Sequence, residues 1–396
     1  MTVKNLRISL LILILVLSTV LTACGSSSNQ SAESNGGGQQ SAAPAQQSAA
    51  PAESAAPAAP AATTENKPVP KPANDKSDTE KVVNVFNWSE YLPDTVIKQF
   101  EQETGIKVNY DTYSSNEEMM AKLSAGNAGY DISVASTYYV EVLRKSDMLL
   151  QIDKTRLPNM KNLGKSFLGL YFDPNNDYSI PYMWGKVVIA YNTKLVGKEI
   201  TSYRDLYDPM FKNNLVLLDD VRSMVGVTLA MLGYDQNSTD PKQLDEAKAE
   251  LMKLKSNIKA FDSDSPKTKL ISGDVKAGIV WDAEGWLAHD ANKDIKVVYP
   301  KEGMNLWQDN FVIPKDAPHY TNALKFINFI LRPEISAEVS KTYPYGNPNE
   351  EALKLLPKEI LDKIVVPESE LKKGQYNRDV GKATVLYDRI WSELKQ

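Results

Sequence analysis

One short stretch places two large aromatic side chains around a carboxylate. VVNVFNWSEYLP begins as a strand of β-branched and aromatic residues and then presents Trp88, Glu90 and Tyr91 close together, before Pro93 can open a helix. The faces of aromatic rings attract cations by about 0.5–2 kcal/mol per well-placed contact. A charge-assisted hydrogen bond to a carboxylate adds roughly 1.5–3 kcal/mol. Such a stretch suits an elongated ligand that carries ammonium groups on apolar methylenes.

Aromatic residues and acids also occur together after or within other predicted strands. Two of these strands are the apolar runs Leu215–Leu218 and Gly278–Val280. Taken alone, an aromatic residue near a strand end usually packs in the core, and an Asp is usually solvated or caps a helix. We expect Asp219 to cap the helix that starts near Arg222. Repetition at several strand ends nevertheless favours one shared binding site. The residues concerned are Asp219, Asp220, Trp281, Asp282, Glu284, Trp286, Trp307, Asp309, Tyr343 and Tyr345.

The composition limits which chemistry the chain can perform. A formal net charge of −5 argues against the basic patch of a nucleic-acid-binding protein. The histidines are His289 and His319, both expected at the surface, and the one cysteine is Cys24, so we predict neither a metal site nor a cofactor. No GxSxG, Walker, HExxH or Rossmann glycine motif is present. Paired acids could instead catalyse glycoside hydrolysis, which sequence spacing does not test.

The N-terminal region has the composition of a targeting segment followed by a linker. Residues 1–23 contain Lys4, Arg7 and a long apolar run, which is typical of a signal peptide. The sequence LTAC ends at Cys24 and resembles a bacterial lipobox, so we predict that this cysteine is lipidated and anchors the chain to a membrane. Residues 24–80 are rich in Gly, Ser, Gln, Ala and Pro and are predicted to form a disordered tether.

From residue 82 onward, predicted strands and helices alternate. A helix over 93–104 is predicted to end at Gly105, and residues 115–118 have the pattern of a capping box. An apolar stripe over 320–331 predicts a core helix. The alternation predicts an α/β fold with a parallel sheet, in which ligands bind at the carboxyl ends of strands, and the chain is long enough for two lobes.

Longer stretches resemble one known family. From about Val82 to the C-terminus, the sequence closely resembles the spermidine/putrescine-binding proteins of bacterial ABC transporters. The stretches that carry the resemblance are, in chain order, FNWSEYLP, FEQETGIKVNYDTYSSNEEM, YDISVASTYYV, FDPNNDYSIPYMWG, DPKQLDEA, VVYPKEGMNLWQDNFVIP and FINFILRPE.

The resemblance implies a two-lobed, periplasmic-binding-protein-like (type II) fold, in which a hinge joins two α/β lobes that close on a ligand. Lobe 1 would comprise residues 82–184 plus 309–343, and lobe 2 would comprise residues 185–308 plus 344–396. The chain would cross between the lobes near residues 182–188, 306–309 and 343–346.

The family's ligand-binding positions also carry over. Two positions depart from the spermidine-preferring pattern, because Ser223 stands where that pattern has a second acid and Asn377 stands where it has glutamine. Glu284 is a candidate replacement for the missing acid, so the choice between spermidine and putrescine stays open. The implied aromatic box is Trp88, Tyr91, Tyr138, Trp281, Trp307 and Tyr345, the implied ammonium-binding acids are Glu90, Asp220 and Asp309, and the implied assisting hydroxyls are Ser89, Ser136 and Ser263.

The resulting hypothesis is a solute-binding lipoprotein, not an enzyme, that captures spermidine and/or putrescine by lobe closure and delivers it to the membrane permease of an ABC transporter. We expect a monomer held outside the cytoplasm, on the periplasmic side or the outer face of the cell membrane, through Cys24. Three alternatives stay open: a binding lipoprotein for another solute such as an oligosaccharide, a carboxylate-pair hydrolase, and a ligand sensor without a transport role.

Overall fold

The computed structural model describes residues 68–396. The predicted signal peptide, the lipidated Cys24 and most of the predicted tether lie outside the described residues. Over residues 68–396, no helix combines the length and the apolar composition needed to cross a membrane.

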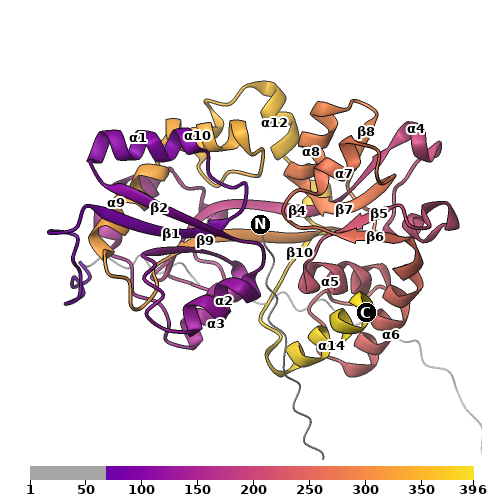
Figure 1. The fold of residues 1–396 in the computed structure, drawn as a ribbon, viewed down its shortest axis with the longest axis horizontal. Coiled ribbons are helices and arrows are strands. Elements are labelled where there is room, and N and C mark those ends of the chain that lie inside the picture. Colours follow the sequence, from indigo (N-terminus) through magenta and orange to yellow (C-terminus); the bar gives the residue numbers. More distant parts are fainter. Residues whose placement is uncertain (1–67) are drawn as a thin grey trace, which may run out of the picture. The chain divides into compact units, whose positions relative to one another are not determined.

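The described elements alternate between strands and helices, as the sequence predicts (Figure 1). The strands are β1 (Val82–Trp88), β2 (Lys107–Tyr113), β3 (Ile132–Ser136), β4 (Ser179–Asn192), β5 (Leu215–Leu217), β6 (Ile258–Phe261), β7 (Ala277–Trp281), β8 (Ile295–Val298), β9 (Asn305–Val312) and β10 (Gln375–Tyr376).

The α-helices are α1 (Asp94–Thr104), α2 (Asn116–Ser124), α3 (Thr137–Lys145), α4 (Thr193–Val196), α5 (Val221–Met231), α6 (Pro241–Leu254), α7 (Pro266–Ile271), α8 (Asp282–Ala291), α9 (Tyr320–Ile330), α10 (Pro333–Thr342), α11 (Glu350–Leu353), α12 (Lys358–Ile364), α13 (Glu368–Leu371) and α14 (Thr384–Lys395). Short 3-10 helices lie at Lys154–Arg156, Pro158–Asn162, Lys165–Phe167, Tyr203–Tyr207, Pro209–Phe211, Lys255–Asn257 and Gly381–Ala383.

Local signals set the helix ends close to the site. α1 ends at Gly105, whose φ of 66° lies in the left-handed region that glycine adopts without a steric penalty. At the start of α2, Ser115 Oγ accepts a hydrogen bond from the Glu118 backbone N–H at 3.1 Å. The Glu118 side chain accepts from Ser114 rather than from Ser115, so half of the predicted capping box forms.

The strands of residues 68–396 form one mixed sheet in the order β2-β1-β3-β9-β4-β7-β5-β6, with β10 beside β9 and β8 beside β4. β1 is parallel to β2 and β3, and β5 is parallel to β6 and β7, as alternating elements predict. β4 and β9 are antiparallel to each other and join the two parallel parts of the sheet. The sequence had predicted a parallel sheet, so the antiparallel centre corrects that prediction.

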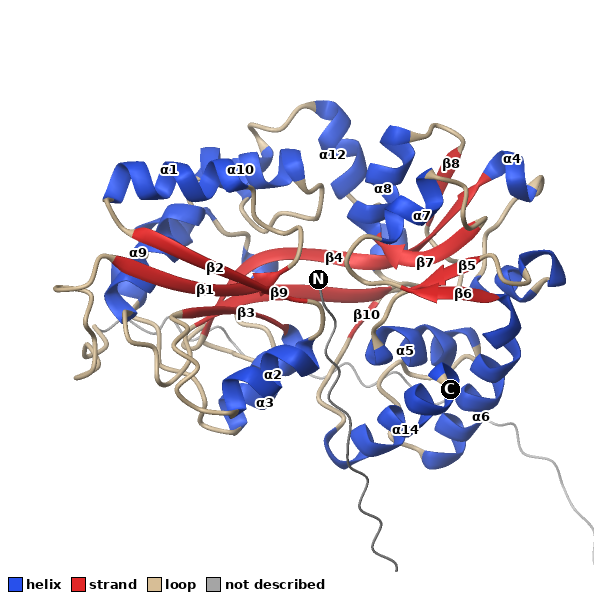
Figure 2. Cartoon of the chain, viewed as in Figure 1, coloured by secondary structure: helices blue, strands red, loops and turns tan. Residues whose placement is uncertain are grey.

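Two lobes follow from this topology (Figure 2). We use lobe 1 for β1–β3 with α1–α3, α9 and α10, and lobe 2 for β5–β8 with α5–α8 and α14. β4 pairs with β9 from Ser179 to Lys186 and with β7 from Val187 onward, so it runs from one lobe into the other. The predicted fold class is therefore correct.

The crossing segments pack too closely for ordinary side chains at two positions. The Trp184 backbone N–H donates to the Gly346 carbonyl at 3.0 Å, which fixes β4 beside residues 343–346. A Cβ on Gly346 would overlap the Trp184 ring, and a Cβ on Gly185 would overlap the Trp307 ring. Glycine at these positions lets the three crossings lie side by side.

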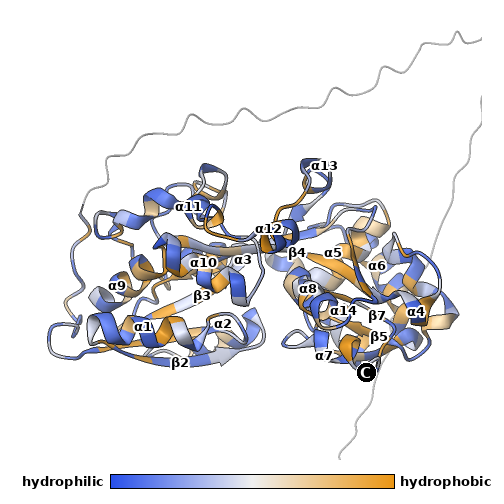
Figure 3. Ribbon diagram, turned by 90° about the horizontal axis from the view of Figure 1, so that it is seen from above, coloured by the Kyte–Doolittle hydropathy of each residue, from blue (hydrophilic) through white to orange (hydrophobic). Residues whose placement is uncertain are grey.

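Each lobe has its own buried core. In lobe 1, Phe100 of α1 packs edge-on against Phe326 of α9 with ring centroids 5.0 Å apart, so the predicted core helix over 320–331 is confirmed. In lobe 2, Leu217 and Ile279 belong to a second core, and β4, β5 and β7 are coloured mostly as hydrophobic in Figure 3. Burial of each such side chain stabilises the fold by roughly 1.5–3 kcal/mol.

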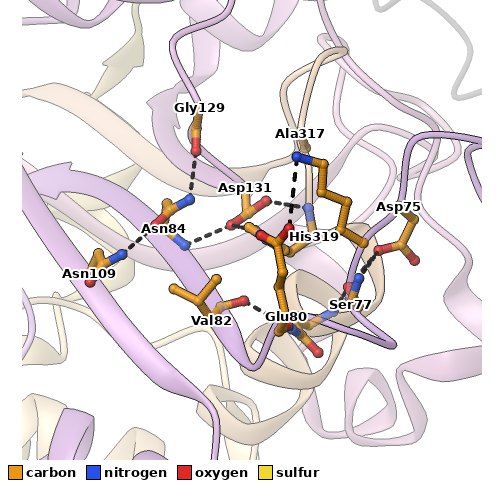
Figure 4. Close-up of polar contacts among 12 residues, drawn as sticks. Asp75, Ser77, Glu80, Val82, Asn84, Asn109, Gly129, Asp131, Ala317 and His319 are labelled. Atoms are coloured by element: carbon orange, nitrogen blue, oxygen red, sulfur yellow. Dashed lines mark hydrogen bonds and ion pairs between the residues drawn. The ribbon is translucent and has the colours of Figure 1, made fainter.

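The segment before β1 is fixed to lobe 1, which corrects the C-terminal end of the predicted tether. Asp75 Oδ2 accepts a hydrogen bond from Thr321 Oγ1 at 2.6 Å, and Ser77 Oγ accepts one from the Asn322 backbone N–H at 3.1 Å. Figure 4 shows the contact between Asp75 and Ser77. These short polar side chains satisfy groups at the start of α9. Composition could not reveal such a match between distant segments.

His319 is also buried, contrary to the expected surface position. Its side chain bridges two carboxylates, with Nδ1 3.0 Å from Asp131 Oδ2 and Nε2 2.9 Å from Glu80 Oε2 (Figure 4). Burial lowers the pKa of His319, but these acids outweigh burial and raise the pKa above its ordinary value. His289 is half-buried and contacts the Ile295 carbonyl.

Candidate ligand-binding site

One cavity between the lobes collects every residue that the family resemblance assigned to ligand binding. Four residues that the repeated strand-end pattern had added to the expected site do not line it, namely Asp219, Asp282, Trp286 and Tyr343. The cavity contains about 650 Å³ of space between atoms, part of it open to solvent. Its lining also includes Glu284, Ser223 and three residues that sequence reasoning missed. The lining residues are Trp88, Ser89, Glu90, Tyr91, Asn116, Ser136, Thr137, Tyr138, Asp220, Ser223, Ser263, Asp264, Trp281, Glu284, Trp307, Asp309, Tyr345 and Asn377.

The missed residues are Asn116, Thr137 and Asp264, which are short polar residues without a distinctive motif. Asn116 and Thr137 directly follow residues that the sequence had assigned to a helix cap and to the site, so proximity was the only available signal. Asn116 Nδ2 donates to Ser136 Oγ at 3.2 Å and thereby orients a predicted hydroxyl.

Strand ends and strand register bring the lining residues together. Trp88 ends β1, Ser136 ends β3 and Trp281 ends β7, as expected for a site at the carboxyl ends of strands. β9 differs, because Trp307 and Asp309 lie within a crossing strand rather than at its end. Ser136 stands directly opposite Asp309 in the antiparallel pairing of β3 with β9, so the register brings a hydroxyl beside the acid.

Four of the predicted box residues form a contiguous cluster of rings. The ring centroids of Trp307 and Tyr345 are 5.1 Å apart, those of Tyr91 and Tyr345 are 5.3 Å apart, and those of Trp281 and Trp307 are 5.9 Å apart. All three contacts are edge-to-face, the arrangement that the ring quadrupoles favour. The contacts hold each ring in one orientation beside the cavity, so little side-chain entropy is lost when a ligand binds.

The other two box residues line the same cavity but pack elsewhere. The Trp88 ring lies 4.7 Å from the Tyr113 ring, and the Tyr138 ring lies 5.1 Å from the Arg222 guanidinium. Nearby, the Ser263 hydroxyl is buried and has no hydrogen-bond partner among residues 68–396. A buried hydroxyl without a partner is costly, and an ammonium N–H could satisfy it.

Asp309 is a buried acid of this site. Its carboxylate accepts a hydrogen bond from Ser136 Oγ at 2.6 Å and one from Tyr91 Oη at 2.8 Å. The described residues place no Lys or Arg in an ion pair with it. Burial raises the pKa of Asp309 from 3.8 to about 7, although both hydroxyls oppose that rise. A cation would restore the ionised form, so the position suits an ammonium group.

Two acids that the repeated strand-end combinations had added to the expected site form ion pairs elsewhere. The expectation that Asp219 caps a helix is therefore wrong. Asp219 forms an ion pair with Lys395 at 2.8 Å, and Asp282 forms a fully buried ion pair with Lys186 at 2.6 Å. Neither acid lines the cavity. The cap of α5 is Asp220, whose Oδ1 accepts from the Ser223 backbone N–H at 2.7 Å. Asp220 therefore caps a helix and lines the cavity at once, and burial raises its pKa.

The two positions that depart from the spermidine-preferring pattern meet in one buried amide network. Ser223 Oγ donates to Asn305 Oδ1 at 3.2 Å, and Asn305 Nδ2 donates to Asn377 Oδ1 at 2.8 Å. Gln236 Oε1 also accepts from Asn305 Nδ2 at 2.9 Å. The network supports one wall of the cavity, and neither Ser223 nor Asn377 carries a charge to offer a ligand.

Glu90 and Glu284 differ from Asp309 because they contact a lysine. Lys267 Nζ lies 2.9 Å from Glu284 Oε1 and also pairs with Glu90. Glu90 has a φ of 49°, a left-handed conformation that is uncommon for a residue with a Cβ. Glu90 follows β1 in lobe 1, whereas Lys267 and Glu284 lie on α7 and α8 in lobe 2. The ion pair therefore joins the lobes across the cavity.

Comparisons with known proteins agree with this architecture. Residues 95–364 match the model of a family described as bacterial extracellular solute-binding protein. The chain belongs to that family. The same arrangement occurs in a solved structure described as a putative spermidine/putrescine ABC transporter from Listeria monocytogenes. The two structures have a TM-score of 0.78 at 36% sequence identity, and the match covers 80% of this chain and 99% of that chain.

Two relatives are closer in sequence. The spermidine/putrescine-binding periplasmic protein of Salmonella typhimurium is 45% identical over 78% of this chain and 90% of the relative. The protein of the same description from Escherichia coli K12 is 44% identical over 81% of this chain and 93% of the relative. This protein is therefore an extracytoplasmic member of its family, and its family membership makes it a solute-binding protein rather than an enzyme.

Proposed function

We propose that the protein captures a polyamine, spermidine and/or putrescine, in the cavity between its lobes and delivers it to the permease of an ABC transporter. The observation that carries this proposal is that a buried acid, Asp309, lies beside a cluster of aromatic rings. A buried carboxylate without a cationic partner among residues 68–396 faces the same cavity as the aromatic cluster. The relatives named above, whose descriptions specify spermidine and putrescine, support the same ligand class.

The chemistry of the lining favours a cation over a neutral sugar. Sugars also stack on aromatic rings, but they do not compensate the charge of a buried carboxylate. Asp309 is buried and Asp220 is half-buried within the lining, and burial raises the pKa of both acids, so a ligand that carries ammonium groups would offset the cost of ionising them. Methylenes between the ammonium groups would lie against Trp307 and its neighbouring rings.

Capture by closure follows from the origin of the lining residues. Trp88, Tyr91 and Ser136 come from lobe 1, whereas Asp220 and Trp281 come from lobe 2. A ligand that binds one lobe first gains the contacts of the second lobe only in the closed form, so binding shifts the population toward closure. Closed protein would then dock on the permease.

We place the lobe boundaries where the chain crosses. Lobe 1 would comprise residues 82–184 and 309–343, and lobe 2 would comprise residues 185–308 and 344–396. α11 follows the last crossing but packs against α10 of lobe 1, with Ala337 and Ala352 in one cluster. The final passage into lobe 2 would therefore occupy a longer stretch than the first two.

The remaining parts of the proposal concern the position of the protein in the cell. Cys24 would carry a lipid anchor on the periplasmic side or the outer face of the membrane, and residues 25 to about 74 would tether a monomeric binding domain to it. Such a tether keeps the protein near its permease and raises the effective concentration of each for the other.

Calorimetric titration tests the ligand class. The full-length protein in detergent, freed of ligand by unfolding and refolding, would be titrated with putrescine, spermidine, spermine and maltose at two salt concentrations. We expect one-to-one binding of at least one polyamine and no heat from maltose. Heat from maltose without heat from any amine would overturn the proposal in favour of a sugar-binding protein.

A further inference from the structure

Lys267 places an ammonium group of the protein itself beside the acids of the cavity. Its Nζ donates to both carboxylate oxygens of Glu284, at 2.9 and 3.0 Å, and to Ser265 Oγ at 3.2 Å. It also donates to Glu90 on the opposite lobe. An alkylammonium has three N–H donors, so these partners use its hydrogen-bonding capacity fully.

This contact is partly shielded from water. The Lys267 side chain is 17% exposed and that of Glu284 is 4% exposed, whereas that of Glu90 is 44% exposed. Burial lowers the pKa of Lys267, but Glu284 and Glu90 outweigh burial and raise it above its ordinary value. Lys267 therefore stays charged at neutral pH, and removal of its charge would leave Glu284 as a buried acid without a cation.

The acids of the cavity fall into two groups. Asp309 and Asp220 repel each other, which helps to raise the pKa of Asp309. Neither acid forms an ion pair within residues 68–396, and the charge of Arg222 lowers the pKa of Asp220 but does not outweigh burial. Glu284 has Lys267 and Glu90 as its charged neighbours instead. One group therefore remains available to cations from solution, whereas the other already holds a cation that belongs to the chain.

We propose that Lys267 is a specificity-determining residue that occupies the Glu90–Glu284 acid pair and so restricts the site to a short diamine, captured by Asp309 and Asp220. This inference rests on the proposed polyamine function and names the ligand within that class. A diamine such as putrescine has two ammonium groups for two available acids. The third ammonium of spermidine would have to displace Lys267 or remain without a partner inside the cavity.

Asp264 is the one other acid of the lining, and it is exposed at the rim. Burial raises its pKa, and hydrogen bonding from Ser89 opposes that rise. Because water solvates this carboxylate, it gains less from a ligand ammonium than a buried acid does. Asp264 therefore does not substitute for the pair that Lys267 occupies.

The ratio of putrescine to spermidine affinity tests the role of Lys267. The full-length protein and its Lys267→Met variant would be titrated calorimetrically with both ligands. We expect the unmodified protein to favour putrescine, and Lys267→Met to shift the ratio toward spermidine by about tenfold or more, the worth of one charge-assisted hydrogen bond. If the substitution also changes lobe closure, it changes the affinity for both ligands by the same factor, so this effect cancels in the ratio of the two affinities.

Three further variants serve as controls. Lys269→Met removes another lysine of α7, which pairs with Asp262 at 2.7 Å outside the cavity lining, and should leave the ratio unchanged. Lys267→Arg keeps the positive charge and should retain the putrescine preference, whereas Lys267→Gln removes the charge and should lose it. The Gln and Arg variants decide the matter if Lys267→Met does not fold.

Two results would overturn the inference. One is a preference for spermidine in the unmodified protein, and the other is an unchanged ratio in the folded neutral variants. Failure of every variant and of the unmodified protein to bind either amine would instead reject the proposed function, so the two failures are distinguishable.

Discussion

The two groups of acids in the cavity use the same residue types in opposite ways. Asp309 is held by the hydroxyls of Ser136 and Tyr91 and has no cationic partner among residues 68–396. Glu284 is equally buried but lies 2.9 Å from the Lys267 ammonium. Burial raises the pKa of both acids to about 7, so burial alone does not separate them.

The difference lies in what compensates each acid. Hydroxyls satisfy the hydrogen-bonding capacity of Asp309 but leave its charge unneutralised, so a cation from solution gains free energy there. Lys267 neutralises Glu284 and Glu90 from within the chain, so a ligand must compete with an ammonium already in place. Two acids at the wall of one cavity can therefore contribute unequally to binding.

The largest expected effect comes from removal of the charge at the available acid. Asp309→Asn should weaken polyamine binding by roughly 1.5–3 kcal/mol, or about 10- to 150-fold, because one charge-assisted contact is lost. Titration calorimetry would measure the loss, with Asp219→Asn as the control, since Asp219 pairs with Lys395 outside the cavity lining. If the Asp309→Asn variant bound polyamines as tightly as the unmodified protein, Asp309 would not be a ligand contact.

The pH dependence should be the next largest effect. The folded protein without ligand holds a proton on Asp309 between the unfolded pKa of 3.8 and about 7, so the contribution of this residue to stability falls as pH rises through that range. A ligand ammonium favours the ionised carboxylate and stays charged throughout. Affinity should therefore rise by about tenfold between pH 6 and pH 8.

Titrations at several pH values would check this expectation, and the shift in Tm on adding ligand should grow with pH in parallel. Asp309→Asn should lose most of the dependence, because the carboxylate of Glu284 is paired with Lys267 rather than with the ligand. A dependence of the same size in that variant would mean that Glu284 meets the ligand as well.

The aromatic cluster should contribute less than the buried charge. Trp281→Ala should reduce affinity by about 2- to 30-fold, because one cation–π contact and part of the apolar wall are lost. Trp286→Ala is a matched control on α8, since Trp286 does not line the cavity. Equal losses in the two variants would point to a general loss of folding rather than to a ligand contact.

The smallest effect concerns the position without an acid. Ser223→Glu should shift preference from putrescine toward spermidine by about 2- to 10-fold, because an added carboxylate can meet a further ammonium. The gain is limited because Ser223 is buried and bonds to Asn305, and because Asp220 would repel the new charge. A competition titration with both amines would measure this shift. An unchanged preference would count against a cation subsite at this position.

The α/β fold class and part of the site could be read from local patterns, whereas site members such as Ser263 and Asn377 came only from the resemblance to a known family. Strand–helix alternation predicted the parallel parts of the sheet, and strand ends predicted Trp88 and Trp281 at the cavity. The antiparallel crossings were not predicted as such, since pairing between β4 and β9 joins segments far apart in the chain. The fixed segment at Asp75 and the buried His319 were missed for the same reason.

What the sequence by itself determined is the supply of chemical groups: aromatic rings and acids at strand ends, no cysteine in the described residues, and helix signals such as Gly105 and Ser115. What the tertiary structure decided is which acid has which partner. Asp220 rather than Asp219 caps α5, Asp282 pairs with Lys186, and Lys267 pairs with acids from both lobes. A charge can be compensated by any group that the fold brings within a few ångströms, so the distribution of charge in the site follows from packing rather than from spacing along the chain.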